Sequence, residues 1–334
     1  MLLPVLKSHW ERYKSHAHID IEQAQKLVNS YNPNKIQSLV LLSDGCANTN
    51  YKITFQNNTA PLVLRIYIRE KNALAREKAI HQLLKNYLPV PLFFYTDASC
   101  TLINHPYALM EWKEGELMRN VILKGDERDI SECAFSAGKC LSVLKNIKFH
   151  QNGFFDENLQ IRPFNQEEEF IPFGLGLLKQ QTVRESLSTS VLVELEQIFY
   201  ESVPFLPKPN EANLTHADFD PANMLVTKTN ATWQVSAILD WEFSFAGSYL
   251  MDMGLMLRYA HKLPHIYEDS FLKGIKDSGA QLPSTWKATA KLMDLLCLLQ
   301  LLYYNPFAER PLMNRDVVEL IENTQTFLKS LLTT

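Results

Sequence analysis

The chain has 334 residues, of which 46% are hydrophobic, 21% charged and 11% aromatic. This composition excludes a disordered chain, and the length suggests two domains. The formal net charge of −4 argues against nucleic acid as the main partner, because such a surface lacks the cation excess that neutralises phosphates. The apolar run Leu295–Tyr304 is shorter than the roughly 18 residues of a membrane span, and the start of the sequence lacks the basic region of a secretory signal.

The five cysteines form no C-x-x-C pair. A disulfide framework and a zinc site are therefore not predicted, and we expect a protein of the reducing cytoplasm with no membrane partner.

Charge is divided unevenly along the chain. Residues 1–110 carry 12 Lys and Arg against 7 Asp and Glu, whereas residues 111–334 carry 21 against 30. A basic first part suits the binding of phosphates, and an acidic second part suits metal ions or a cationic substrate.

The first third of the chain predicts a small sheet. A short amphipathic helix is expected over Ile19–Tyr31 and a second helix over Ala73–Asn86. Short runs rich in β-branched and aromatic residues, with a turn at Asp44–Gly45, predict a five-stranded antiparallel sheet. These strands are Ser38–Leu42, Asn50–Phe55, Leu62–Ile68, Leu92–Tyr95 and Tyr107–Glu111.

After Gly115 the apolar spacing becomes helical, with two strand-like pieces at Met224–Thr227 and Trp233–Ile238. The expected helices are Ser131–Phe149, Ser186–Val203, Leu250–His261 and Trp286–Tyr304. The pattern predicts an α+β protein with two lobes: a sheet lobe at 1–111 and a mainly helical lobe at 112–334.

The most informative motif is the stretch His216–Asn223, HADFDPAN, which is followed by two strands that end in Asp240. Phosphoryl transfer needs a carboxylate beside the attacking hydroxyl and oxygen ligands for magnesium. Asp218 and Asn223 have the H-x-D-x-x-x-x-N spacing of kinase catalytic loops. Asp240, 17 residues beyond Asn223, is placed to complete the metal site.

Five blocks in order carry a family resemblance: DGCANTNYKI, LVLRIY, YALMEW, HADFDPAN and ILDWE. Together they resemble the aminoglycoside phosphotransferase/choline kinase family over roughly Ser38 to Tyr259. The resemblance implies a bilobal protein-kinase-like fold, with a small antiparallel-sheet N-lobe for nucleotide phosphates and a larger helical C-lobe for catalysis. It also implies ATP or GTP as nucleotide and Mg²⁺ as cofactor.

The resemblance assigns roles around the catalytic loop. Asp218 is the catalytic base or hydroxyl-orienting carboxylate, and Asn223 and Asp240 are magnesium ligands. His216 and Asp252 are expected to support the loop. The alternative is an ordinary polar turn at Asp220–Pro221.

Arg65 lies mid-strand among apolar neighbours, and Glu77 lies on the apolar stripe of the 73–86 helix. An Arg65–Glu77 pair would reproduce the cation and acid that position the nucleotide phosphates in kinases. The alternative makes Glu77 a surface acid near Lys78.

The remaining nucleotide contacts rest on the resemblance alone. Asn48 and Thr49 are candidates to bind phosphate, because their segment takes the place of the glycine-rich loop. Met110, Glu111 and Trp112 are the expected hinge that holds the adenine edge. Without the resemblance, these segments read as a hairpin turn and an edge strand.

The sequence departs from the kinase pattern at several positions. Arg65 replaces the usual lysine, and residues 43–50 hold one glycine where kinases have three. Ala217 stands where the family commonly has glycine. Trp241–Glu242 follows Asp240 without a D-F-G motif, which favours a small-molecule kinase over a regulated protein kinase.

The sequence thus predicts an ATP- and magnesium-dependent phosphotransferase that acts on a hydroxyl of a small molecule. Acids in the second lobe would suit aminoglycoside-like or choline-like acceptors: Glu242, Glu268, Asp269 and Asp294. The alternative is that they are solvated surface acids. Two alternatives remain open, a nucleotide-binding protein with little catalysis and a kinase that acts on another protein.

Overall fold

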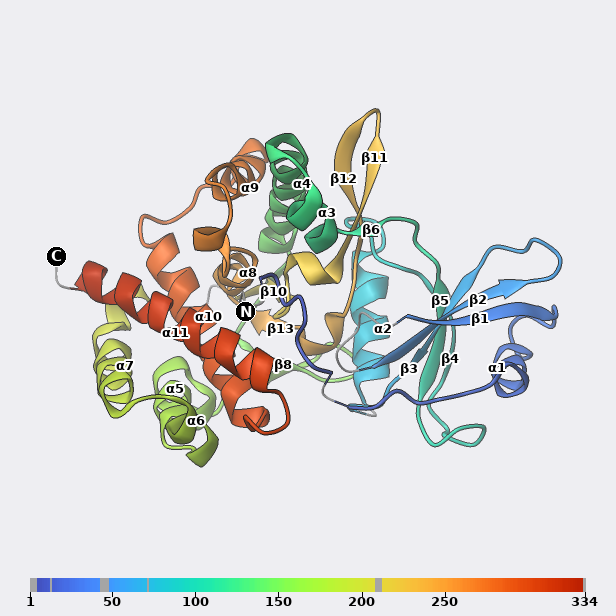
Figure 1. The fold of residues 1–334 in the computed structure, drawn as a ribbon, viewed down its shortest axis with the longest axis horizontal. Helices are drawn as coiled ribbons and strands as arrows, with labels where there is room; N and C mark the ends of the chain where they lie inside the picture. Colours follow the sequence, from blue (N-terminus) through green and yellow to red (C-terminus); the bar gives the residue numbers. More distant parts are fainter. Residues whose placement is uncertain (1–4, 13, 43–47, 71, 208–211, 333–334) are drawn as a thin grey trace.

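The computed structural model describes residues 5–12, 14–42, 48–70, 72–207 and 212–332. The chain forms a sheet lobe and a larger helical lobe that lie side by side (Figure 1). Within the described part of the chain, no helix is long and apolar enough to cross a bilayer.

The sheet of the first lobe has five antiparallel strands in the order β1-β2-β3-β5-β4. This confirms the predicted sheet; the Asp44–Gly45 turn lies outside the described residues. The strands are β1 (Ile36–Leu42), β2 (Thr49–Phe55), β3 (Leu62–Ile66), β4 (Phe93–Asp97) and β5 (Tyr107–Glu111).

Two helices cover the sheet. α1 (Ile21–Val28) begins with a capping box in which Asp20 accepts from Gln23 N, and it packs Leu27 onto a sheet core that includes Ile53. α2 (Ala73–Leu84) lies on the other side, between the sheet and the helical lobe (Figure 1). Ala73 packs with sheet residues, whereas Ile80 joins the core of the helical lobe. α2 is therefore shared by both lobes.

The second lobe is mainly helical, as the sequence predicts. The Trp286–Tyr304 helix has its predicted ends, whereas Ser186–Val203 is divided because the chain is extended at Leu187 and Ser188 caps a new helix. The helices are α3 (Met118–Lys124), α4 (Glu127–Asn146), α5 (Phe170–Leu178), α6 (Gln181–Ser186), α7 (Thr189–Glu201), α8 (Tyr249–Met256), α9 (Ile266–Asp277), α10 (Trp286–Tyr304) and α11 (Pro311–Leu332). Short 3₁₀ turns are η1 (Gln166–Glu168), η2 (Val203–Phe205), η3 (Pro221–Asn223), η4 (Trp241–Phe243) and η5 (Ala260–Lys262).

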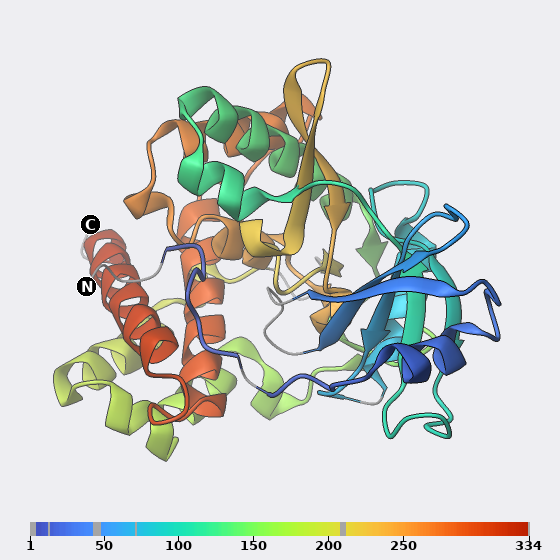
Figure 2. The ribbon, with the colours of Figure 1, turned by 45° about the vertical axis from the view of Figure 1, so that its right-hand side comes forward.

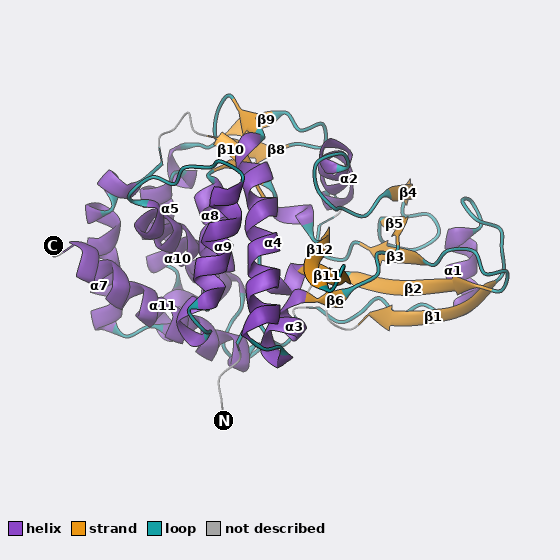
Figure 3. Cartoon of the chain, turned by 90° about the horizontal axis from the view of Figure 1, so that it is seen from above, coloured by secondary structure: helices purple, strands orange, loops and turns teal. Residues whose placement is uncertain are grey.

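Two small antiparallel sheets accompany these helices. One has the order β7-β10-β13-β8-β9, and the other, β12-β11-β6, lies at the junction of the lobes (Figure 3). The predicted β11–β12 hairpin is confirmed, and the last two residues of the expected 131–149 helix form β7 instead. The strands are β6 (Glu116–Leu117), β7 (Lys148–Phe149), β8 (Gly153–Phe155), β9 (Ile161–Pro163), β10 (Ala212–Thr215), β11 (Met224–Thr229), β12 (Thr232–Ile238) and β13 (Phe245–Gly247).

Residues 5–12 run along the helical lobe before the chain reaches α1 (Figure 2). Leu6 is 2% exposed and belongs to the main core of the helical lobe. Trp10 Nε1 donates to Asp316 Oδ2 at 2.8 Å, and the Glu11 carboxylate accepts from Leu312 N and Met313 N at the start of α11. This N-terminal segment thus packs with the helical lobe although it precedes the sheet.

α4 and α9 pack through two glycines. A Cβ added at Gly138 would lie 2.1 Å from Phe271 O, and one at Gly274 would lie 2.1 Å from Phe135 O. Both obstacles are helix backbone, so the helices would have to separate.

We expect Gly274→Ala to destabilise the protein by about 2 kcal/mol or more, because an overpacked contact costs about 1–3 kcal/mol and here the backbone itself must move. The matched control is Gly176→Ala in α5, where nothing lies within 4 Å of the added Cβ. That change should be neutral or stabilising by up to about 1 kcal/mol through helix propensity. Urea unfolding measures both. Equal midpoints for Gly274→Ala and the wild type would contradict the close contact.

Candidate active site

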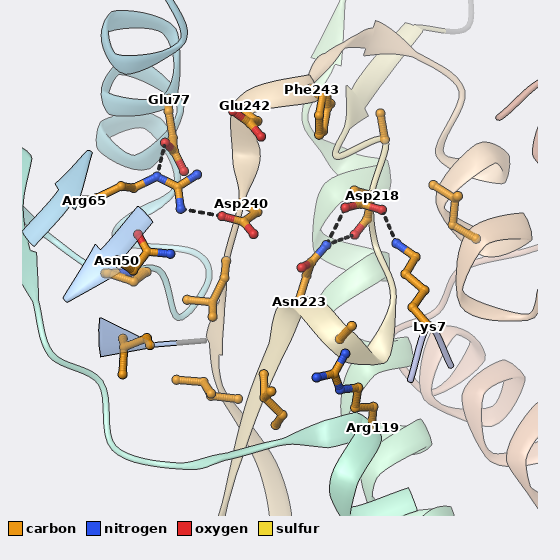
Figure 4. Close-up of a pocket in the computed structure, with 18 of the residues that line it drawn as sticks. Lys7, Asn50, Arg65, Glu77, Arg119, Asp218, Asn223, Asp240, Glu242 and Phe243 are labelled. Atoms are coloured by element: carbon orange, nitrogen blue, oxygen red, sulfur yellow. Dashed lines mark hydrogen bonds and ion pairs between the residues drawn. The ribbon is translucent and has the colours of Figure 1, made fainter. Parts of the chain in front are cut away.

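A cavity of about 610 Å³ is lined by residues of both lobes. Asp218, Asn223, Asp240 and Arg65 all line it, although they come from four separate elements and turns (Figure 4). The structure therefore brings together the predicted catalytic residue, both predicted metal ligands and the predicted phosphate-binding cation.

The loop between β10 and η3, which carries Asp218, is held by a buried carboxylate. Asp252 Oδ2 accepts from His216 N at 2.8 Å, and its Oδ1 accepts from Ala217 N at 2.9 Å. Asp252 is fully buried in α8. Because these bonds fix two successive peptide N–H groups, they fix the direction in which Asp218 leaves the loop.

His216 supports the same loop from within. Its Nδ1 accepts from Asp218 N at 3.1 Å, so Nε2 carries the proton and donates to Leu239 O at 2.8 Å. Burial lowers the pKa of His216, although the Asp218 carboxylate opposes this. A neutral imidazole with both nitrogens bonded to backbone fits the predicted supporting position and not a proton shuttle.

Ala217 has φ 65°, in the left-handed region where a Cβ is strained. This is the position at which the resembled family commonly has glycine. The two Asp252 bonds hold the strained peptide in place.

We expect Ala217→Gly to raise the free energy of unfolding by about 0.5–1 kcal/mol, because glycine adopts this φ without strain. Thermal unfolding of the two proteins measures the change. As a control, Ala222→Gly in η3 removes a methyl group at a residue with ordinary negative φ and should destabilise. A lower Tm for Ala217→Gly would show that the alanine is not strained.

Asp218 is held on both carboxylate oxygens. Asn223 Nδ2 donates to Asp218 Oδ2 at 2.7 Å, and Lys7 Nζ lies 2.5 Å from Asp218 Oδ1 (Figure 4). Lys7 also pairs with Asp220. Burial by itself would raise the pKa of Asp218, but the Lys7 ammonium overrides it and lowers this pKa to about 2. The carboxylate is therefore ionised at neutral pH.

Arg65 makes the predicted contact with Glu77 at 3.1 Å, between Nε and Oε2. Its Nη1 lies 2.5 Å from Asp240 Oδ1, so one guanidinium joins β3, α2 and the end of β12. Glu77 is 1% exposed and accepts from Tyr67 Oη at 2.6 Å, which rules out the surface alternative. Arg65 Nη2 is buried with no hydrogen-bond partner among the described residues, as expected of a donor reserved for an anion.

Asp240 has φ 60°, a left-handed conformation that aspartate tolerates better than most residues. Asn223 and Asp240 could hold a magnesium ion with their remaining side-chain oxygens. The described residues hold no cluster of three or more His, Cys, Asp or Glu suited to a metal. A site of one carboxylate and one amide fits magnesium, which takes its other ligands from water and phosphates.

The predicted hinge also lines the cavity. Met110, Glu111 and Trp112 face it at the end of β5, and Glu111 N is bonded to Leu92 O at 2.8 Å. Apolar side chains from both lobes make up the neighbouring walls: Leu42, Val63, Leu117, Leu225 and Leu239. Such a slot suits a flat aromatic base.

Asn48 and Thr49 do not line the cavity. Asn48 donates to Glu242 Oε2 at 2.9 Å and accepts from Ile68 N at 3.1 Å, so both ends of its amide are occupied. Thr49 accepts from Ala17 N. Asn50 lines the cavity instead, because neighbouring residues of β2 point to opposite faces.

Glu242, one of the acids expected to suit a cationic acceptor, is buried at the junction of the lobes. Besides its bond with Asn48, its backbone carbonyl accepts from Arg76 Nη2 at 2.8 Å. Burial raises the pKa of Glu242 to about 7, and Arg65 opposes this. These contacts join α2 and residue 48 to η4.

The helical lobe and the N-terminal segment form the far wall of the cavity, which we call the acceptor wall. The described residues of the acceptor wall include no acid. They are Lys7, Trp10, Leu255, Arg258, Cys297, Gln300, Leu301, Tyr304, Asn305 and Arg310.

The acids that suggested a cationic acceptor do not gather on this wall. Asp294 is buried against Arg258, with Oδ1 2.6 Å from Nη2. Glu268 pairs with Lys287, and Asp269 lines a separate surface hollow. Sequence reasoning also missed Lys7, Arg258 and Arg310, since nothing in their local pattern marks a site residue.

In a comparison with known protein families, a model of the phosphotransferase enzyme family matches residues 38–292. A curated relative, acyl-CoA dehydrogenase family member 10 of Mus musculus, is 24% identical over 246 residues. That match covers 72% of this chain but only 22% of the mouse protein.

Solved structures share the fold at low identity. Aminoglycoside phosphotransferase APH(4)-Ia, in a ternary complex with AMP-PNP and hygromycin B, is 14% identical with a TM-score of 0.65, covering 90% of this chain and 98% of its own. The GDP and kanamycin complex of an APH(2") enzyme is 16% identical with a TM-score of 0.65, covering 91% and 98%.

Proposed function

The chain belongs to the phosphotransferase enzyme family and has a protein-kinase-like fold, and from this premise we propose that it transfers the γ-phosphate of ATP or GTP to a hydroxyl of a small molecule. The observation that carries the proposal is the convergence of Asp218, Asn223, Asp240 and Arg65 on one cavity. These residue types match the needs of phosphoryl transfer: an orienting carboxylate, metal-binding oxygens and a cation for phosphate.

In this proposal, Asp218 receives the hydroxyl of the acceptor. Its carboxylate is ionised and fixed at both oxygens, so it can orient the hydroxyl and accept its proton as the oxygen attacks phosphorus. Asn223 and Asp240 would hold Mg²⁺, which when bound neutralises charge on the transferred phosphoryl group.

The nucleotide would lie on the sheet side of the cavity. The backbone of Met110–Trp112 would meet the base, and Arg65, held by Glu77, would direct its free Nη2 to a phosphate oxygen. Asn50 is the additional polar side chain at this end. We assign Asn48 and Thr49 to holding the start of β2, not to phosphate binding.

The acceptor wall supports a neutral or anionic acceptor over a polycation. Arg258 is 3% exposed and Arg310 is 5% exposed, and both line this wall together with Lys7. A polyamine entering here would find no unpaired carboxylate among the described residues of this wall, because Asp218 is already paired with Lys7 and Asp294 with Arg258. Trp10 and Tyr304 give the wall its aromatic surface.

We expect Asp218→Asn and Asp240→Asn each to lower kcat by about 10² or more, because each removes a group that acts on developing charge. Asparagine preserves the shape of both side chains and the left-handed conformation of residue 240. The exposed Asp269→Asn is the matched control and should leave kcat unchanged. Steady-state release of nucleoside diphosphate measures all three. Full activity of either site variant would refute the assignment.

We expect acceptors to be separated by charge in a panel assayed with Mg-ATP and Mg-GTP. Hydroxy acids, simple sugars and homoserine should raise nucleoside diphosphate release, whereas aminoglycosides and choline should not. Asp218→Asn gives the background. Stimulation by the cationic compounds alone would overturn the reading of the acceptor wall while leaving the phosphotransferase proposal intact. Nucleotide binding with no transfer to any pool would favour a binding protein.

A further inference from the structure

Lys7 is the unexpected member of the catalytic site. Its ammonium lies 2.5 Å from Asp218 Oδ1 and also pairs with Asp220, and its side chain is 12% exposed. The contact joins residues 211 positions apart in the chain. Lys7 also precedes residues 38–292, the range that the family model covers.

The segment that carries Lys7 is anchored at several points. Leu6 is buried in the main core, Trp10 donates to Asp316, and Glu11 accepts from the first amides of α11. On the other side, Arg12 Nη2 donates to Asn48 O at 2.6 Å, next to β2 of the sheet lobe. The ammonium is therefore held in place by both lobes rather than by a free chain end.

The charges around Lys7 require a cation. Asp220 is 5% exposed, and its carboxylate also caps η3 by accepting from Ala222 N at 2.7 Å. Among the described residues, Lys7 is the cation that pairs with both Asp218 and Asp220. Without it, these two carboxylates would stand close together in a buried site, which is a costly arrangement. Their repulsion would turn Asp218 away from its present direction.

We propose that Lys7 is a positioning residue of the phosphotransferase: it clamps the Asp218 carboxylate from the side opposite Asn223 and aims it at the acceptor hydroxyl. This inference rests on the proposed function. Lys7 Nζ contacts Oδ1 and Asn223 Nδ2 contacts Oδ2, so the carboxylate cannot rotate without losing one of them. Such fixation is the pre-organisation that catalysis by orientation requires.

Lys7 can stay in place while the acceptor binds. A carboxylate has about four lone-pair positions, and the two clamping contacts use one on each oxygen. The remaining positions can accept the hydroxyl. An opposite role, in which Lys7 blocks the hydroxyl's place and must leave before the reaction, predicts a gain of activity when the ammonium is removed.

The test compares Lys7→Ala and Lys7→Arg with a matched control, Lys14→Ala, at an exposed residue. Release of nucleoside diphosphate from Mg-ATP is measured for each variant, both with the acceptor that the panel yields and with water alone. We expect Lys7→Ala to lower kcat by about 10², the loss typical of a misplaced catalytic group. The affinity for AMP-PNP should be unchanged, because Lys7 lies away from the nucleotide side. Lys7→Arg should keep kcat within about tenfold of the wild type, since it preserves the charge.

Propylammonium, which replaces the atoms that Lys7→Ala removes, should restore part of kcat in that variant alone. Sodium at the same ionic strength should not. A purely structural lysine would not be rescued in this way, and folding is checked by the Tm of each variant. Unchanged or increased kcat in Lys7→Ala would overturn the proposal. If Asp218→Asn keeps full activity, the proposed function fails; if Asp218→Asn is inactive while Lys7→Ala is normal, only the role of Lys7 fails.

Discussion

The buried guanidinium of Arg65 pairs with residues of both lobes, and the cavity between the lobes depends on this contact. An ion of this size is costly to remove from water unless it is paired on more than one side. Glu77 of α2 supplies one partner and Asp240 at the end of β12 supplies the other. The sheet lobe, α2 and the β11–β12 hairpin are therefore placed relative to each other by the need to compensate one charge. Nη2 of the same side chain has no hydrogen-bond partner among the described residues, so alignment of the lobes and a donor for an anion come from one residue.

Backbone strain on the other side of the cavity is compensated in a similar way. Ala217 and Asp240 both have left-handed conformations at the ends of strands, where the chain turns to direct side chains into the cavity. Asp252 bonds two successive amides of the first turn, and His216 links that turn to Leu239, next to the second. Asp252 and His216, which do not line the cavity, thus determine where Asp218 and Asp240 lie.

Much of this arrangement follows from sequence pattern. The five-stranded sheet, the β11–β12 hairpin and the Arg65–Glu77 contact have local signals: alternation, turn residues, and charges placed on apolar faces. The sequence named Asn48 and Thr49 as candidates and did not single out Asn50, because which residue lines the cavity depends on the partners that fold against the start of β2. For a related reason, the sequence could not predict where the acids of the second lobe lie relative to the cavity. Composition does not reveal that Asp294 is neutralised by Arg258 or that Glu268 pairs with Lys287. Lys7 has no local signal at all, since its partner Asp218 lies 211 residues further along the chain.

The 211-residue separation between Lys7 and Asp218 has a consequence for how the protein is made. During synthesis, the segment with Lys7 emerges before its partners and remains without them until the loop between β10 and η3, α10 and α11 have followed. Contacts between such distant residues form late, because a long loop must close before they gain any free energy. The site around Asp218 is therefore expected to be completed only when α10 and α11 dock against the segment that carries Lys7.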